Sequence, residues 1–135
     1  MTTFATCSAQ ESERNAAKEV EIYQSKKEIA KRSDRCVKYF NVLGDTTRLQ
    51  IIIHLLKEPN REMSVDAITQ AVFLSRPAVS HHLKILKDND VLVCRAQAQY
   101  NYYSINKDAE IWQSLCDLFS EIDDLLKKFK SIEAE

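Results

Sequence analysis

Apolar residues recur at helical spacing along most of this chain, and the pattern is clearest in its middle third. Val79, Leu83 and Leu86 follow one another at intervals of three to four residues, as on the buried face of an amphipathic helix. Ser75 is a good N-cap, and Pro77 lies in the first turn, where a missing N–H is tolerated. The sequence therefore predicts a helix whose outer face carries Arg76, Ser80, His81, Lys84 and Lys87.

The N-terminal third is predicted to be helical after a short polar segment. Residues 1–13 are small and polar, and we expect a disordered tail there, followed by one domain over residues 14–135. A long helix is predicted over residues 14–43, either continuous or interrupted near Ser33 and Asp34. Gly44, the only glycine, follows this helix and suits a C′ position with positive φ.

Two shorter helices are predicted next. Asp45 is a good N-cap for the first of them, and its inward stripe is expected at Leu49, Ile52, Ile53 and Leu56. Ser64 can cap the second, SVDAITQAV, which leads through the short link FLS into the Ser75 helix. The last two helices form a predicted helix-turn-helix pair, whose turn lacks the common glycine.

After Asp90 the pattern changes from helical to β. Residues 91–96 and 100–105 are rich in Val, Tyr and Ile and flank the polar AQAQ, which predicts a hairpin. The predicted fold class is therefore mostly α with a small β-hairpin, a winged helix-turn-helix.

The last predicted helix, from Asp108 to about Ser131, carries more apolar surface than a small domain needs. One heptad seam comprises Ile111, Leu115, Leu118, Ile122, Leu125, Phe129 and Ile132. A second stripe beside it holds Trp112, Phe119 and Leu126. We infer that one of the two faces packs against a partner subunit, the alternative being a helix that lies deep in the monomer.

The charge balance does not by itself indicate nucleic acid. The 135 residues include 19 Lys and Arg against 20 Asp and Glu, so any signal for DNA must be local. Short hydroxyl, imidazole and cationic side chains at the start of the Ser75 helix can meet base edges and phosphates in a major groove. A solvated helix face would show the same pattern, so both interpretations stay open.

Sequence features that this chain lacks indicate its cellular compartment and argue against enzyme chemistry. It has no run of about 18 apolar residues and no apolar signal region, so we expect a cytoplasmic protein with no membrane contact and with reduced cysteines. The cysteines, at positions 7, 36, 94 and 116, form no CxxC pair. No glycine-rich phosphate loop or catalytic arrangement is present, so neither an enzyme nor a cofactor is expected.

Residues from about 37 to 106 resemble the ArsR/SmtB family of bacterial winged-helix repressors. The strings that carry the resemblance are FNVLGDTTRLQIIIHLL, LSRPAVSHHLKILKDNDVL and YNYYSI. The resemblance implies a homodimer formed by the first and last helices, with paired recognition helices on a palindromic operator in double-stranded DNA. The implied DNA contacts are Ser75, Arg76, Ser80 and His81, with Lys84 on phosphate.

Arg76 and the wing differ from the other implied DNA contacts. Arg76 suits a bidentate contact to guanine or a contact to phosphate, and the two roles stay open. Many family members have an Arg-Glu-Gly-Arg type wing tip, whereas here only Arg95 is charged, so we expect a weak minor-groove contact.

Members of this family are often released from DNA by an inducer, which here is sought among metal-binding residues and thiols. Glu62–Asp66 replaces the family's cysteine-containing metal string and has no thiolate, and no histidine follows Asp108, so no metal site is expected. Cys36 and Cys116 are candidates for a thiol switch, with an inert buried pair as the alternative. Family members with such a switch have a cysteine where this chain has Ile53.

The sequence thus predicts a homodimeric, sequence-specific DNA-binding repressor that a cysteine redox or persulfide signal releases. One alternative is a metal-responsive repressor of the same family with an atypical site. The other is a winged-helix module that binds a protein partner and does not bind DNA.

Overall fold

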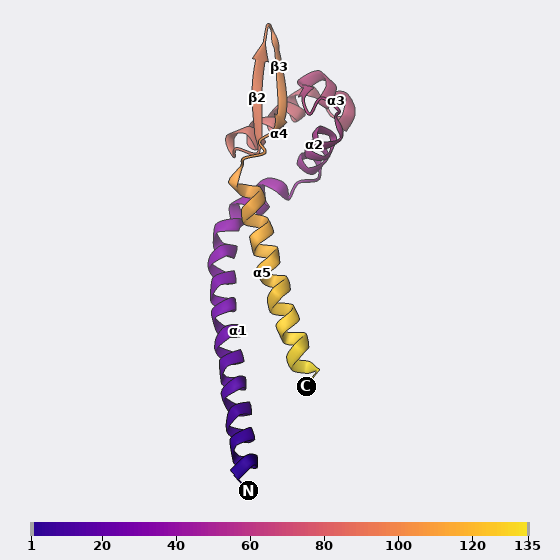
Figure 1. The fold of residues 1–135 in the computed structure, drawn as a ribbon. Helices are drawn as coiled ribbons and strands as arrows, with labels where there is room; N and C mark the ends of the chain where they lie inside the picture. Colours follow the sequence, from indigo (N-terminus) through magenta and orange to yellow (C-terminus); the bar gives the residue numbers. More distant parts are fainter. Residues whose placement is uncertain (1, 135) are drawn as a thin grey trace. The chain divides into compact units, whose positions relative to one another are not determined.

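The computed structural model describes residues 2–134, which are mostly helical with one small antiparallel sheet (Figure 1). In chain order the elements are α1 (Thr2–Leu43), α2 (Thr46–Lys57), β1 (Met63–Ser64), α3 (Val65–Val72), α4 (Arg76–Asp88), β2 (Leu92–Gln97), β3 (Tyr100–Ile105) and α5 (Glu110–Glu133). This order of helices followed by a hairpin confirms the predicted winged helix-turn-helix class. No helix in the described range is long and apolar enough to cross a membrane.

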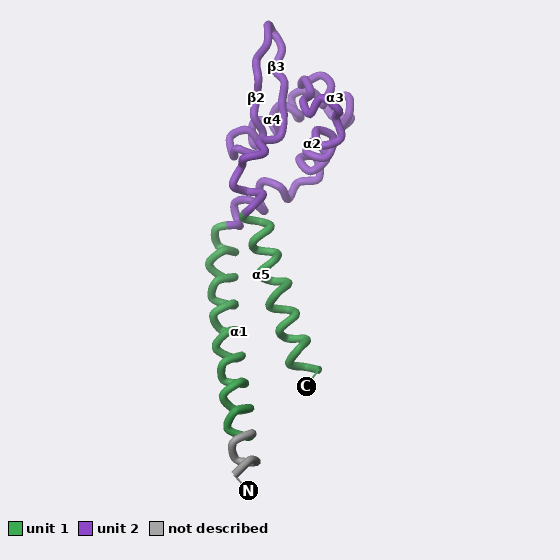
Figure 2. The backbone as a smooth tube through the Cα atoms, in the orientation of Figure 1, with its two compact units in different colours: residues 1–35, 114–135 green, residues 36–113 purple. Residues whose placement is uncertain are grey.

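The described residues form two compact units (Figure 2). The winged unit comprises residues 36–113 and contains α2, α3, α4 and the sheet. The hairpin unit comprises the chain up to Arg35 and from Ser114 onward, and so consists of most of α1 and most of α5.

Each short helix of the winged unit begins at the N-cap that the sequence predicts. The side chains of Asp45, Ser64 and Ser75 each accept a hydrogen bond from the backbone N–H three residues further on, at 3.1, 3.2 and 3.3 Å. Such a bond satisfies one of the N–H groups that a helix leaves unpaired in its first turn. The three predicted caps are therefore confirmed.

The core of the winged unit is built on the inner face of α4. Val79, Leu83 and Leu86 are 0% exposed, as the sequence predicts. They belong to the same buried set as Ile68 of α3 and Leu55 of α2. The burial of this stripe leaves the remaining face of α4 outside the core.

The predicted inward stripe of α2 is wrong by a rotation of the helix. The buried residues are Ile51, Ile52 and Leu55, whereas Leu49, Ile53 and Leu56 are 44–68% exposed. The segment LQIIIHLL offers an apolar stripe at helical spacing on more than one side, so periodicity alone does not select the buried one. Only Ile52 is shared between the predicted and the observed stripe.

The sheet has the strand order β1-β3-β2 and is antiparallel throughout. β2 and β3 pair from Leu92 opposite Ile105 to Gln97 opposite Tyr100, which leaves a two-residue turn at Ala98 and Gln99. Ala98 has a φ of 54°, so the tight turn is made without glycine. The sequence did not predict β1, a two-residue strand that pairs with the middle of β3.

In the hairpin unit α1 and α5 run antiparallel. Lys128 Nζ donates to Ser25 Oγ at 3.2 Å, and Arg32 Nε donates to Glu121 Oε1 at 2.8 Å. Leu118 of the predicted heptad seam is only 3% exposed, whereas Phe119 of the second stripe is 56% exposed. Within this unit Leu118 of the seam is therefore covered by the chain itself, whereas Phe119 and Leu126 of the second stripe are left at the surface.

The start of α1 and the conformation of the glycine that follows its predicted end at Leu43 differ from the sequence prediction. α1 begins at Thr2, so the structure is helical where the composition predicts a disordered tail, and no glycine or proline lies between residues 2 and 43 to interrupt it. The predicted positive φ of Gly44 is also wrong. The reason for a glycine is instead steric, because a Cβ there would lie 2.7 Å from the Phe40 carbonyl oxygen.

We expect Gly44→Ala to destabilise the fold. The added methyl group meets backbone rather than a movable side chain, so the corner between α1 and α2 must shift, at a cost of about 1–3 kcal/mol. Chemical denaturation of the two proteins measures this difference. Asp45→Ala, which removes a cap but adds no clash, is the reference, with an expected loss of about 1 kcal/mol. An unchanged midpoint for Gly44→Ala would show that the close approach to Phe40 does not constrain the corner.

Candidate nucleic-acid interface

The outer face of α4 is a continuous polar surface. Ser75, the N-cap, and Arg76, Ser80, His81 and Lys84 are all exposed. Because the opposite stripe is fully buried, these side chains cannot turn inward without opening the core. The structure thus brings the sequence-predicted DNA contacts of the Ser75 helix onto one accessible face.

Arg76 is held at the start of α4 by a carboxylate from the preceding helix. Its Nη1 donates to Asp66 Oδ1 of α3 at 2.7 Å, and both side chains are more than half exposed. A single contact to one oxygen leaves most of the five guanidinium donors available. Asp66 therefore orients Arg76 while its remaining donors face solvent.

A polar cluster connects the start of α2 to the back of α4. Arg48 Nε and Nη2 donate to the carbonyl oxygens of Val42 and Asn41 at 2.6 and 3.1 Å, at the end of α1. Its Nη1 lies 3.5 Å from Nδ1 of His82, which is 17% exposed and 3.9 Å from an Asp45 oxygen. The backbone N–H of Arg48 is the main reason that the pKa of Asp45 lies below its usual value. His82 thus supports α4 from within, while its neighbour His81 is exposed.

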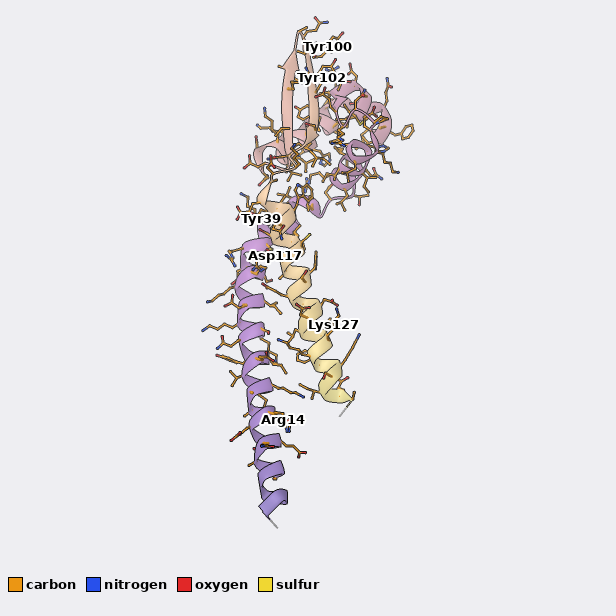
Figure 3. All side chains as sticks on the ribbon, viewed as in Figure 1. Arg14, Tyr39, Tyr100, Tyr102, Asp117 and Lys127 are labelled. Atoms are coloured by element: carbon orange, nitrogen blue, oxygen red, sulfur yellow. The ribbon has the colours of Figure 1, made fainter. Side chains whose placement is uncertain are left out.

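The wing arginine has most of its donors occupied. Arg95 Nε and Nη2 donate to the two oxygens of Glu62 at 3.1 and 2.5 Å, and Nη1 donates to Gln97. Its guanidinium carbon also lies 4.9 Å from the ring centre of Tyr102. Tyr102 belongs to β3, where Figure 3 labels it. The hydrogen bonds between Arg95 and Glu62 lower the pKa of Glu62 and raise the pKa of Arg95. To contact a phosphate, Arg95 must exchange partners.

Glu62 and Asp66 were not among the sequence-predicted site residues. They flank β1, four residues apart, and each pairs with one of the two arginines expected to face DNA. Opposite charges in the first turns of the two predicted helices were a signal for the Arg76 pair. No local pattern indicates the pair between Glu62 and Arg95, which are 33 residues apart.

The candidate thiols differ in accessibility. Cys36 is 0% exposed within the winged unit, whereas Cys116 is exposed in the hairpin unit. Cys94 lies opposite Tyr103 in the sheet, and the pKa of Tyr103 is raised, mainly by burial and then by Cys94. Among residues with described side chains, which exclude Cys7, no three His, Cys, Asp or Glu are placed to hold a metal ion.

Comparison with known proteins identifies the family of the winged unit. The profile described as "Bacterial regulatory protein, arsR family" matches residues 45–92. The transcriptional repressor SdpR of Bacillus subtilis (strain 168) is 37% identical over 67 residues, which cover 50% of this chain and 71% of SdpR.

Solved structures show the same fold. The crystal structure of NolR from Sinorhizobium fredii matches with a TM-score of 0.54 and 33% identity, covering 70% of this chain and 90% of NolR. The homodimeric winged helix-turn-helix DNA-binding domain Mb0332 from Mycobacterium bovis matches with a TM-score of 0.50 and 23% identity, over 73% of this chain and 84% of Mb0332, which supports the fold alone. The chain therefore belongs to the arsR family of bacterial regulatory proteins and is a winged-helix DNA-binding transcriptional regulator of that family.

Proposed function

We propose that this protein is a homodimeric repressor that binds a palindromic operator through two copies of α4. The observation that carries the proposal is the polar outer face of α4, fixed by complete burial of Val79, Leu83 and Leu86 on the inner side. In a helix-turn-helix protein the start of the second helix meets base edges in the major groove. The proposed contacts are Ser75, Arg76, Ser80 and His81 on bases or nearby phosphates, and Lys84 on phosphate.

The proposed homodimer uses the apolar surface that the hairpin unit leaves exposed. Phe119 and Leu126, seven residues apart on α5, are 56% and 49% exposed, and Val20 and Tyr23 on α1 are 61% and 64% exposed. Residues spaced by seven lie on one side of a helix and suit a second helix as partner. Mb0332, whose fold this chain shares, is described as homodimeric. A two-fold dimer reads a palindrome, because each α4 meets an equivalent half-site.

One observation favours the alternative, a winged-helix module that binds a protein rather than DNA. The wing is nearly neutral, since Arg95 is paired with Glu62 and the turn residues carry no charge. A DNA-binding wing ordinarily contributes cations to phosphates. We therefore assign the DNA contact to α4 rather than to the wing, and binding measurements distinguish the two functions.

We expect the affinity for the operator to fall steeply as salt is raised, and the single variants to differ in kind. Arg76→Ala should remove discrimination at one base pair, worth about 1–3 kcal/mol, if the contact is to guanine. Lys84→Ala should weaken all sequences equally and reduce the salt slope by about one. Arg95→Ala should have the smallest effect, because most of its donors are occupied. Fluorescence anisotropy on DNA from upstream of the protein's own gene measures all three. Salt-insensitive or undetectable binding would support the protein-interaction module instead.

We expect analytical ultracentrifugation to give twice the chain mass of 15.6 kDa for the wild-type protein. The Phe119→Glu variant should be monomeric. The charged side chain cannot be buried unpaired in an apolar interface. Ser120→Glu, at an exposed neighbouring position of α5, is the matched control and should stay dimeric. A wild-type monomer that still binds DNA tightly would exclude the proposed assembly.

We also propose that a thiol signal releases the repressor from DNA, and the structure allows a prediction of which cysteine reacts first. Exposed Cys116 should be alkylated well before buried Cys36. If peroxide removes two electrons and two protons from this pair to form a disulfide, wild-type protein should lose DNA affinity, and Cys36→Ser and Cys116→Ser should not. Unchanged affinity after oxidation of both thiols, verified by mass spectrometry, would show that the cysteines do not regulate binding.

A further inference from the structure

The turn of the helix-turn-helix contains an unusual residue. Phe73 joins α3 to α4 and has φ 56° and ψ 41°, in the left-handed region. Its side chain is 91% exposed, more than that of any other large hydrophobic residue described in the chain. A bulky aromatic residue is therefore held at a backbone position that favours glycine, with its ring in solvent.

Neither property stabilises the protein. A left-handed conformation costs a non-glycine residue about 1 kcal/mol or more, and bulky residues adopt it rarely. An exposed ring gains none of the free energy that a buried aromatic side chain provides. Glycine, which is common in this turn, would avoid both costs. Stability alone therefore gives no reason for phenylalanine at this position, and backbone strain of this kind tends to accompany function.

The position of Phe73 is continuous with the proposed DNA surface. It lies two residues before the cap Ser75 and three before Arg76, the first residue of α4. The next residue, Leu74, is 40% exposed. These two apolar side chains adjoin a polar and cationic surface, so the apolar patch is too small for a stable protein interface. A ring without charge or hydrogen-bonding groups is likewise unsuited to a phosphate.

We propose that Phe73 contacts the C5 methyl group of a thymine beside the bases that the start of α4 meets, and that it determines sequence specificity at that position. The thymine methyl is the apolar group that the major groove presents, and apolar side chains read it by contact. This inference rests on the proposed DNA binding by α4. It adds a residue and a base to that function, and it explains why the turn tolerates strain.

The test removes the methyl group from the DNA and the ring from the protein. Operators are selected from a random-sequence duplex pool, and each thymine is then replaced singly by deoxyuridine, which lacks only the methyl. Wild-type protein should lose affinity about four-fold at one thymine in each half-site, the value of one buried methyl group. Phe73→Ala should bind the thymine and deoxyuridine duplexes equally. Leu56→Ala, which truncates an exposed leucine of α2, should keep the wild-type difference.

A second variant separates contact from folding. Phe73→Gly should raise the thermal unfolding midpoint by a few degrees, because glycine relieves the left-handed strain, and should still lose the thymine preference. Wild-type indifference to deoxyuridine at every position, or a Phe73→Ala protein that keeps the preference, overturns the inference. Failure to select any sequence from the pool would instead count against the proposed function.

Discussion

The proposed DNA-contacting surface depends on the complete burial of one face of α4. Val79, Leu83 and Leu86 lie at 0% exposure, and burying each such side chain contributes about 1.5–3 kcal/mol. A rotation of α4 about its axis by a single residue would bring members of this stripe into water. The core therefore fixes which side chains face outward, and His82 adds a polar contact to Asp45 and Arg48 on the same supporting side. The packing of the core therefore decides which side chains of α4 are available for the proposed DNA contact.

Ion pairs decide which arginines near that surface keep hydrogen-bond donors available. The two arginines nearest the proposed DNA contact are paired, Arg76 through one carboxylate oxygen of Asp66 and Arg95 through both oxygens of Glu62. Binding of a phosphate to a paired arginine exchanges one anion for another, so the net gain is smaller than for an unpaired cation. Arg76 retains donors for DNA, whereas Arg95 is committed to the wing. The net charge of −1 therefore does not prevent individual cations of α4, such as Arg76 and Lys84, from meeting DNA as proposed.

The sequence predicts those parts of the fold that local chemistry determines. Asp45, Ser64 and Ser75 cap helices because a short oxygen-bearing side chain reaches a nearby N–H, and this requires no knowledge of the fold. The stripe of α2 was misplaced because several of its faces are apolar, and contact with α3 and α4 decides which one is buried. The pair between Glu62 and Arg95 could not be predicted either, since it depends on the register of β1 against β3. The accessible face of α4 follows from the sequence, whereas the pairing of Arg95 with Glu62 follows from tertiary structure.

The length of α1 gives an independent reason to expect a second chain. Ser25 faces Lys128 and Arg32 faces Glu121, so each step along α1 is matched by a step back along α5. By this register α5, which ends at Glu133, stops close to residue 20 of α1. The preceding residues of α1 thus extend past the end of α5, and a helix in a protein gains most of its stability from packing against other elements. The exposed Val20 and Tyr23 lie at the start of the paired region, where the proposed dimer would continue the helical packing that α5 no longer provides.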